Sequence, residues 1–273
     1  MKKIFILIVI LAALGGGYYY YQQNYASVPT PISTSNNNQM NNSEMLASNK
    51  ETEITSSEVE YSPGIKGLYA TPTAPGNYPG IVIMHEWWGL NDNIKDMARQ
   101  LAKEGYRVVA VDLYHGEVAT TSERANELRT ALKQDEANKN MQDAIKFLQD
   151  QGITKIASLG WCFGGGQSLQ LALSGQKLDA TVIYYGQLTS DEEQLNKIQW
   201  PVLGIFGAKD TSITPEQVGG FETALNNLSI KNEIHIYPDV GHAFANPSGQ
   251  NYAPEATKDA WEKTMAFLKT NLQ

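Results

Sequence analysis

The sequence has 273 residues, of which 42% are hydrophobic, and a formal net charge of −8 at pH 7. This negative balance, without any basic stripe, excludes a protein that binds nucleic acid through its surface charge. A single cysteine excludes an intrachain disulfide and a Cys-rich zinc site, and the four histidines lack the spacing of metal ligands, so we expect no metal.

The N-terminus has the form of an export segment. Two lysines precede an apolar run at residues 4–14 and a tyrosine cluster at residues 18–21, as in secretory signals. An A-x-A-like cleavage site is missing, and residues 4–21 are just long enough to cross a bilayer with the tyrosines at its interface. We therefore expect residues 1–21 to be either a cleaved signal peptide or a membrane anchor. Both place the rest of the chain outside the cytoplasm, as a periplasmic or secreted protein.

Residues 22–58 are rich in Asn, Ser, Thr and Gln and have almost no periodic apolar residues. Such a composition cannot bury enough surface to offset the entropy lost on ordering. It predicts a flexible linker, and the folded domain is expected over residues 59–273.

Within this domain, short apolar runs alternate with amphipathic or charged segments. The runs expected to form strands are residues 67–70, 81–84, 107–111, 155–159, 180–186, 201–207 and 233–237. The segments expected to form helices are residues 91–105, 122–151 and 167–173, one opened by a capping box at Thr214 and Gln217, and a closing helix with Trp261, Met265, Leu268 and Leu272 on its inner face. The alternation predicts an α/β fold, with a mostly parallel sheet covered on both faces and ligands bound at the ends of its strands.

The stretch at residues 159–166 (LGWCFGGG) contains the lone cysteine between an expected strand and an expected helix. Gly160 and Gly164 stand two residues to either side of Cys162, which matches the G-x-S-x-G nucleophile elbow with sulfur in place of oxygen. Glycine is required there because neighbouring Cβ atoms would collide with the adjoining strand and helix. The spacing alone leaves Cys162 either a nucleophile or a buried core thiol, which is the commoner fate of a single cysteine.

Two later loops supply a carboxylate and an imidazole. Asp210 follows the expected strand at residues 201–207 and His242 follows the one at residues 233–237, so both fall at the same edge of the sheet. The chain order nucleophile, acid, base is that of the α/β-hydrolase fold. The imidazole would take the thiol proton, and the carboxylate would fix the imidazole tautomer. Either residue alone would be unremarkable, but together with Cys162 they indicate a catalytic triad.

A loop at residues 85–89 (HEWWG) follows an expected central strand and should lie beside the elbow. We expect the backbone N–H groups of Trp87 and Phe163 to form an oxyanion hole. Glu86 would enter a pocket lined by Trp87, Trp88 and Phe163, which is reason for a raised carboxyl pKa. The alternative is that the tryptophans are core aromatics and Glu86 is solvated.

Five motifs jointly resemble the dienelactone hydrolase family over nearly all of the expected domain. They are HEWWGL at residues 85–90, VDLY at 111–114, GWCFGG at 160–165, GAKD at 207–210 and GHAF at 241–244. The resemblance implies an α/β-hydrolase fold, a triad of Cys162, His242 and Asp210, and a thioester on the cysteine that water hydrolyses. It implies that Glu86 contacts the nucleophile at rest and helps to deprotonate it when substrate binds. It also implies an ester or lactone substrate and no cofactor.

The sequence departs from the family at two positions. Dienelactone-degrading members carry two arginines that bind the substrate carboxylate, where this chain has His115-Gly116 and Asn246. Because the bidentate clamp is absent, we expect a neutral or differently placed ester or lactone to be preferred over an anionic dienelactone. Protonated His115 would bind a carboxylate only weakly. The side chains expected to contact substrate are Trp88, Tyr114, His115 and Phe244.

The leading hypothesis is a monomeric, cofactor-independent hydrolase of a small-molecule ester or lactone. A thiol redox protein would need a resolving thiol, which this chain lacks. A phosphate-binding loop would need G-x-G-x-x-G spacing or a P-loop Lys-Ser/Thr, and residues 160–166 have neither. A noncatalytic small-molecule-binding protein on a retained α/β-hydrolase fold stays open as the alternative, because the lost arginines indicate a changed pocket.

Overall fold

The structure is a computed structural model that describes residues 52–273. The predicted signal peptide or anchor at residues 1–21 lies outside the described residues, as does most of the predicted linker at residues 22–58. Within residues 52–273, no helix combines the length and the apolar character that a bilayer crossing requires.

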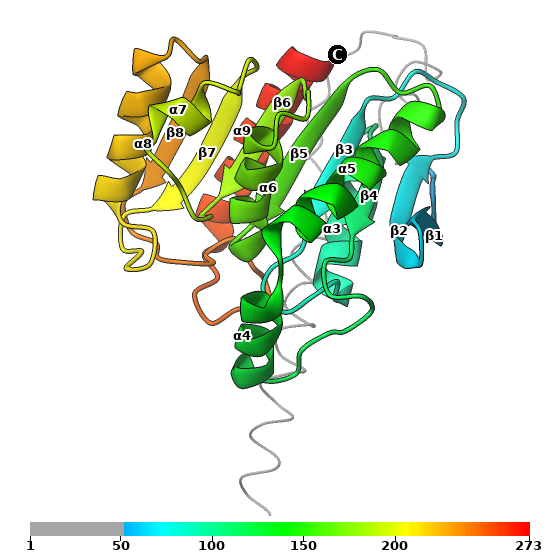
Figure 1. The fold of residues 1–273 in the computed structure, drawn as a ribbon, viewed down its shortest axis with the longest axis horizontal. Helices are drawn as coiled ribbons and strands as arrows, with labels where there is room; N and C mark the ends of the chain where they lie inside the picture. The colour runs from blue at the N-terminus through cyan, green and yellow to red at the C-terminus, as the bar shows by residue number, and fades with distance from the viewer. Residues whose placement is uncertain (1–51) are drawn as a thin grey trace, which may run out of the picture. The chain divides into compact units, whose positions relative to one another are not determined.

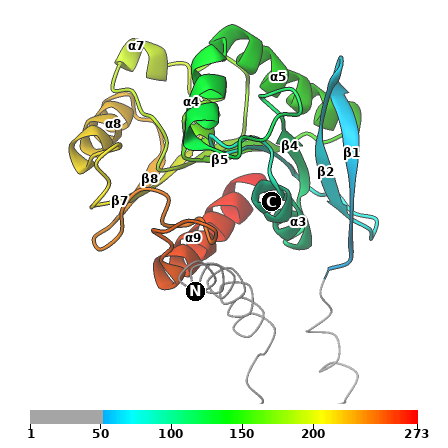
Figure 2. The same ribbon diagram turned by 90° about the horizontal axis from the view of Figure 1, so that it is seen from below.

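The described residues form an eight-stranded sheet with helices on both faces (Figures 1 and 2). The strands are β1 (Ile54–Ser62), β2 (Ile65–Pro72), β3 (Gly80–Met84), β4 (Arg107–Val111), β5 (Ile156–Trp161), β6 (Ala180–Tyr184), β7 (Val202–Gly207) and β8 (Asn232–Tyr237). The helices are α3 (Asp92–Lys103), α4 (Ser122–Ala131), α5 (Gln134–Asp150), α6 (Phe163–Leu173), α7 (Glu192–Leu195), α8 (Pro215–Asn227) and α9 (Pro254–Leu272). The order across the sheet is β1-β2-β4-β3-β5-β6-β7-β8.

All neighbouring strands from β4 to β8 pair in parallel, whereas β2 pairs antiparallel with both β1 and β4. In Figure 2, α3 and α9 lie on one face of the sheet and α5 and α8 on the other. The prediction of a mostly parallel sheet with helices on both faces is therefore confirmed. β3, β5, β6 and β7 are buried over their whole length, which explains why their sequences are continuous apolar runs.

The first strand begins earlier than the sequence indicates. β1 starts at Ile54, so residues 54–58 of the predicted linker belong to the sheet. This strand lies at the edge, pairs only with β2, and exposes most of its side chains before Tyr61. Because an edge strand with polar side chains buries little, its sequence lacks the apolar run that marks the central strands.

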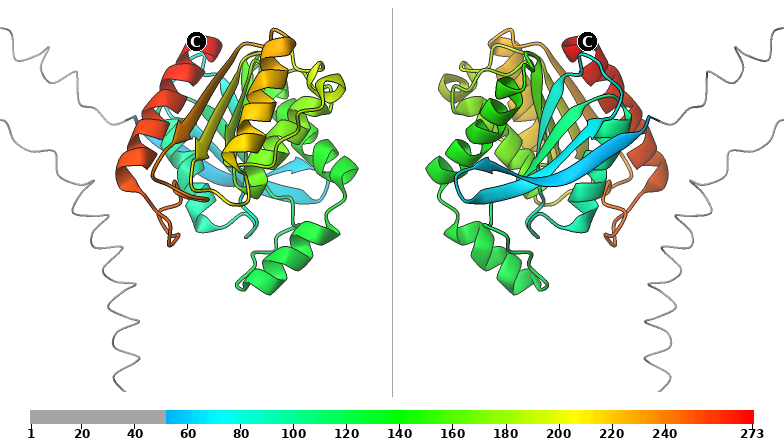
Figure 3. Two further views of the ribbon diagram at one scale, coloured as in Figure 1. Left: turned by 90° about the vertical axis from the view of Figure 1, so that its left-hand side faces the viewer. Right: turned by 90° about the vertical axis from the view of Figure 1, so that its right-hand side faces the viewer.

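The single helix expected over residues 122–151 is two helices. The helix is interrupted at Leu132 and Lys133, whose backbones are extended, with ψ angles of 129° and 122°. α5 buries Ala137, Met141 and other apolar residues against the sheet, whereas α4 buries only Ala125. Figures 1 and 3 show α4 projecting from the sheet edge where the loop after β8 also lies. No glycine or proline marks this break in the sequence.

Helix α6 starts at Phe163, four residues earlier than expected, so the glycines at residues 164–166 form its first turn. The predicted capping box is present in α8, where the Thr214 side chain accepts from the N–H of Gln217 and the Gln217 side chain accepts from the N–H of Thr214. The loops that follow β3, β5, β6, β7 and β8 all leave the same edge of the sheet, since these strands are parallel.

Candidate active site

Cys162 occupies a strained turn between β5 and α6. Its φ of 54° and ψ of −120° lie outside the regions that side-chain-bearing residues favour. A Cβ on Gly160 would come within 2.1 Å of the Gly164 carbonyl oxygen, and one on Gly164 within 2.2 Å of the Met84 carbonyl oxygen. The turn is thus closed by contacts that only glycine permits, and the thiol is left half-buried at its apex.

Three predicted site residues come together at this turn. His242 Nε2 lies 3.1 Å from Cys162 Sγ, and His242 Nδ1 lies 2.7 Å from Asp210 Oδ2. Asp210 is held in turn, because its Oδ1 accepts hydrogen bonds from the N–H groups of Ser212 (2.8 Å) and Ile213 (3.0 Å). The thiol, the imidazole and the carboxylate therefore form one continuous hydrogen-bonded series.

The electrostatics of this series favour a protonated imidazole. Burial alone would lower the pKa of His242, but its hydrogen bonds to Asp210 and Cys162 outweigh that effect and raise the pKa to about 10. Burial would likewise raise the pKa of Asp210, yet the hydrogen bonds from His242, Ile213 and Ser212 hold it below its ordinary value. Asp210 is thus a carboxylate that orients His242 and stabilises a positive charge on it.

Glu86 lies close by but has a different partner from the one implied by the sequence. Its side chain is buried, and its Oε2 accepts a 2.5 Å hydrogen bond from the Asn246 amide. Cys162 is paired with His242 instead. Burial raises the pKa of Glu86 to about 7, against the lowering effects of His242 and of the Asn246 hydrogen bond. The raised pKa agrees with the sequence expectation, whereas the resting contact with the nucleophile is absent from the described hydrogen bonds.

The backbone of the loop after β3 is fixed by a buried histidine. His85 Nε2 accepts from the N–H of Leu113 (3.1 Å), which leaves Nδ1 to donate to the Glu86 carbonyl (2.6 Å). Burial lowers the pKa of His85, in keeping with this neutral tautomer. The N–H groups of Trp87 and Phe163, the two expected oxyanion-hole donors, have no hydrogen-bond partner among residues 52–273. Phe163 is also the first residue of α6, where the helix dipole favours negative charge.

A family model for the dienelactone hydrolase family matches residues 65–272. The chain belongs to this family. A relative from Saccharolobus solfataricus that carries the provisional name carboxymethylenebutenolidase is 32% identical over 247 residues, covering 75% of this chain and 93% of the relative. Protein usf of Aquifex pyrophilus is 30% identical over 219 residues, covering 76% of this chain and 94% of that protein.

Among solved structures, a provisionally assigned dienelactone hydrolase from Klebsiella pneumoniae is 26% identical, with a TM-score of 0.73. The match covers 80% of this chain and 99% of that one. The family and its relatives make this chain a hydrolase with an α/β-hydrolase fold.

The four side chains expected to contact substrate have different surroundings. Trp88 is half-buried, with its ring centroid 5.0 Å from that of Trp87. Tyr114 is buried and stacks on Phe163 at 5.8 Å, beside the nucleophile. His115 is exposed on a turn with a φ of 53°, and no described contact joins it to the site. Phe244 is fully buried and its ring lies beside those of Tyr185 and Tyr237, so its side chain belongs to the core.

Two residues that the sequence argument left unassigned also belong to this site. Asn246, noted in the sequence only as a lost arginine, is the partner of Glu86. Tyr185 follows β6 with a φ of 36°, its ring lies 5.3 Å from that of His242, and its side chain is fully buried. Burial and the charges of Glu86 and Cys162 raise the pKa of Tyr185 well above its ordinary value. In the sequence, the only indication that Tyr185 belongs to the site was its position directly after a buried strand, β6.

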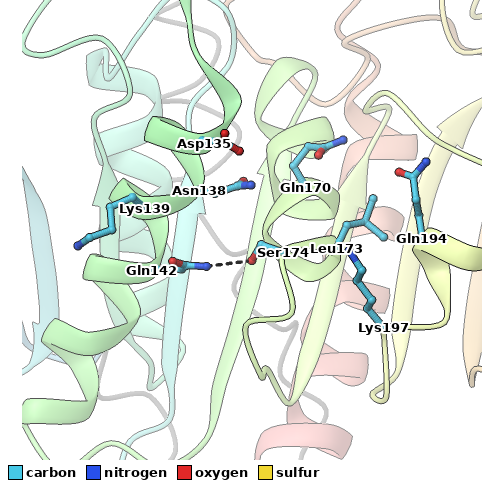
Figure 4. A pocket seen from close by; sticks show the side chains of 9 residues that line it. All are labelled: Asp135, Asn138, Lys139, Gln142, Gln170, Leu173, Ser174, Gln194 and Lys197. Atoms are coloured by element: carbon cyan, nitrogen blue, oxygen red, sulfur yellow. Dashed lines mark hydrogen bonds between the residues drawn. The ribbon is translucent and has the colours of Figure 1, made fainter.

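A separate polar cavity of about 450 Å³ lies among α5, α6 and α7 (Figure 4). It is lined by Asp135, Asn138, Lys139, Gln142, Gln170, Leu173, Ser174, Gln194 and Lys197. Its α6 residues come from the C-terminal half of that helix, whereas Cys162 precedes the N-terminal end. The cavity therefore lies away from the nucleophile and contributes nothing to the proposed chemistry.

Proposed function

We propose that this protein hydrolyses a small-molecule carboxylic ester or lactone through a thioester on Cys162. The observation that carries the proposal is the hydrogen-bonded series in which His242 lies 3.1 Å from Cys162 Sγ and 2.7 Å from Asp210 Oδ2. A nucleophile, a base and an orienting carboxylate in this order are the groups that acyl transfer requires. Family membership supports the same reaction class.

In the first half-reaction, His242 holds the proton of Cys162 and the thiolate attacks the carbonyl carbon. A C–S bond forms as the carbonyl π electrons move to oxygen, which the N–H groups of Trp87 and Phe163 stabilise. Collapse of this adduct breaks the ester C–O bond, and the leaving alkoxide takes the proton from His242. With a lactone, the freed hydroxyl remains attached to the acyl group on Cys162.

In the second half-reaction, water attacks the thioester carbon while neutral His242 takes a proton from that water. The tetrahedral adduct collapses with cleavage of the C–S bond, which releases the acid and restores the thiolate beside protonated His242. Asp210 stabilises the imidazolium in both halves, since its own pKa is held low by three hydrogen bonds. The steps at the acyl carbon use these side chains, the backbone donors and water.

The proposed substrate class is inferred from the residues at two arginine positions of the relatives and from Glu86. The two positions at which dienelactone-degrading relatives carry arginine have an exposed His115 and a buried, neutral Asn246. Glu86 adds a carboxyl group with a pKa of about 7 beside Asn246. An anionic acyl group would meet partial negative charge there instead of a guanidinium. We therefore propose that neutral esters or lactones are better substrates than carboxylated dienelactones.

The test is a panel of p-nitrophenyl esters and neutral and carboxylated lactones, with the full-length wild type and the Cys162→Ala variant. We expect turnover of neutral members and its loss in Cys162→Ala. Undiminished turnover in Cys162→Ala would refute the role of this thiol. A wild type that binds members of the panel without hydrolysing any of them would favour a noncatalytic binding protein. Faster hydrolysis of carboxylated dienelactone than of neutral esters would refute the substrate class alone.

A further inference from the structure

The side-chain amide of Asn246 has a fixed orientation. Its Oδ1 accepts two hydrogen bonds, from the N–H of Ser248 at 2.9 Å and from the Ser248 hydroxyl at 2.7 Å. Because the oxygen is occupied on the Ser248 side, the NH₂ group must face the other way, and there it donates to Glu86 Oε2 at 2.5 Å. The backbone of the same residue is also held, since its N–H donates to the Ala243 carbonyl and its carbonyl accepts from Gly249.

This hydrogen bond joins two buried groups that come from distant parts of the chain. Glu86 is 3% exposed and Asn246 8% exposed, and they are 160 residues apart in the sequence. A buried carboxyl group needs a hydrogen-bond donor. For Glu86 that donor is the side-chain amide of Asn246. While Glu86 is held by Asn246, the thiol of Cys162 is paired with His242. The carboxyl group and the nucleophile thus have separate partners in the structure.

We propose that Asn246 is a positioning residue that holds the Glu86 carboxyl away from the Cys162 thiol, so that the Cys162–His242 pair is assembled before any substrate binds. This inference rests on the proposed function of Cys162 as the nucleophile. It assigns a role to the very position at which the family's dienelactone-degrading members have an arginine. A neutral amide can donate to the carboxyl group whether that group is protonated or ionised.

The titratable groups that face Glu86 determine how the pair responds to pH. The positive charge of His242 acts on Glu86 and lowers its pKa, and Glu86 together with Cys162 acts on the Tyr185 hydroxyl. The Asn246 hydrogen bond also lowers the pKa of Glu86, although burial keeps it near 7. Loss of the Asn246 donor must therefore move the titration of Glu86 to higher pH. Replacement of the amide by a carboxyl group must move it further, because the two acids would share a proton.

The experiment follows alkylation of Cys162 by iodoacetamide from pH 5 to pH 9, in the full-length protein and without any substrate. Cys162 is the only cysteine, so every thiol adduct is on this residue. We expect the wild-type rate profile to contain an inflection near pH 7 that is absent in Glu86→Gln. In Asn246→Ala we expect that inflection about one pH unit higher, with alkylation at pH 6 roughly tenfold slower, because Glu86 can then pair with the thiol. Asn246→Asp should shift it further still.

A matched control is Asn227→Ala, which removes a 2.7 Å amide–carboxylate hydrogen bond to Glu192 on the surface, away from the site. Its alkylation profile should equal that of the wild type. If Asn246→Ala does not fold, Asn246→Asp carries the test, since it nearly preserves the shape of the side chain. Unshifted inflections in folded Asn246 variants, or a wild-type profile identical to that of Glu86→Gln, would overturn the inference. Alkylation needs no hydrolysis, so these outcomes are separate from a failure of the ester assay.

Discussion

Two buried carboxyl groups lie at the same edge of the sheet, and each is held by a side chain from the loop after β8. Asp210 accepts three hydrogen bonds, from His242 and from the N–H groups of Ser212 and Ile213, and its pKa is below the ordinary value. Glu86 accepts a single described hydrogen bond, from Asn246, and its pKa is raised to about 7. Burial disfavours both charges, so the number and kind of donors decide the outcome.

This difference separates the tasks that the two groups can perform. A carboxyl group that stays ionised at every working pH can orient an imidazole and stabilise its positive charge, as Asp210 is placed to do. A carboxyl group with a pKa near 7 carries a proton for part of the time at neutral pH, so Glu86 can accept or release one as the site fills. Two acids in contrasting environments therefore divide the work of one site between a fixed charge and a movable proton.

The largest effect is expected from Asp210→Asn. Since Ser212 and Ile213 both donate to one side-chain oxygen, the asparagine oxygen should face them and its NH₂ should face His242. His242 Nδ1 would then have to accept, which places the ring proton on Nε2 and prevents it from taking the thiol proton. We expect the turnover of a neutral ester at pH 7.5 to fall by about 10⁴-fold, as for other triads with a reversed tautomer.

The control for that variant is Asp239→Asn. This exposed carboxylate forms an ion pair with Lys209 at 3.2 Å, just outside the site. Its turnover should match that of the wild type. A fall of less than tenfold in Asp210→Asn would show that Asp210 is not needed to set the tautomer, and the contrast with Glu86 would be lost.

The second effect is on the pH dependence of turnover in Glu86→Gln. Removal of a proton-carrying group near the nucleophile should lower turnover by roughly 10²-fold, a magnitude typical of general acid–base groups. The variant should also lose the limb of the kcat/KM profile centred near pH 7, because that is the pKa of Glu86 in the folded protein. Turnover across pH 5 to 9 checks both. Retention of the limb would assign it to another group.

The third effect is on stability, and its sign follows from the same raised pKa. Folded Glu86 titrates near 7, above its ordinary value of 4.5, so the folded state binds the proton more tightly than the unfolded state. Stability from this group is present below about pH 4.5 and is lost as pH rises through 7. We expect the wild type to lose about 2.5 kcal/mol of unfolding free energy between pH 5 and pH 8 relative to Glu86→Gln.

Urea unfolding at the two pH values measures this difference directly. The exposed Glu262→Gln variant serves as the control and should follow the wild type. If the free energies of unfolding of the wild type and of Glu86→Gln differ by the same amount at pH 5 and at pH 8, Glu86 does not titrate as a buried acid in the folded protein.

The centre of the fold was predictable because its sequence signals are local. β3 and β7 are continuous apolar runs of the kind that strands buried on both faces show, and the glycines around Cys162 mark a turn that only small residues allow. Asp210 and His242 could be placed because each comes within five residues of the end of a strand, Asp210 after β7 and His242 after β8. The start of β1 and the break between α4 and α5 were missed, since an exposed edge strand and a glycine-free helix break leave little local pattern.

The partner of Glu86 was missed for a different reason. Asn246 is 160 residues away, and its amide is aimed by Ser248 in an irregular loop. Neither periodicity nor motif spacing carries that information, which exists only in the folded arrangement. The resemblance marked residue 246 as a position where related enzymes carry arginine, and the structure shows that Asn246 contacts Glu86 there.

The smallest effect is expected from Ser248→Ala, which tests how tightly Glu86 is held compared with Asp210. The variant removes the hydroxyl that donates to Asn246 Oδ1 but keeps the Ser248 N–H that donates to the same atom at 2.9 Å. The amide orientation is still fixed by one donor. We therefore expect turnover within about threefold of the wild type, which corresponds to less than the net contribution of one typical hydrogen bond.

Ser190→Ala, an exposed serine elsewhere, is the control, and alkylation of Cys162 across pH 5 to 9 is the measurement. The Glu86 inflection should move by no more than a few tenths of a pH unit. A shift in Ser248→Ala as large as that in Asn246→Ala would mean that the hydroxyl, and not the backbone N–H, aims the amide. Glu86 would then be held through a chain of side chains alone, in contrast to Asp210, which the backbone itself fixes.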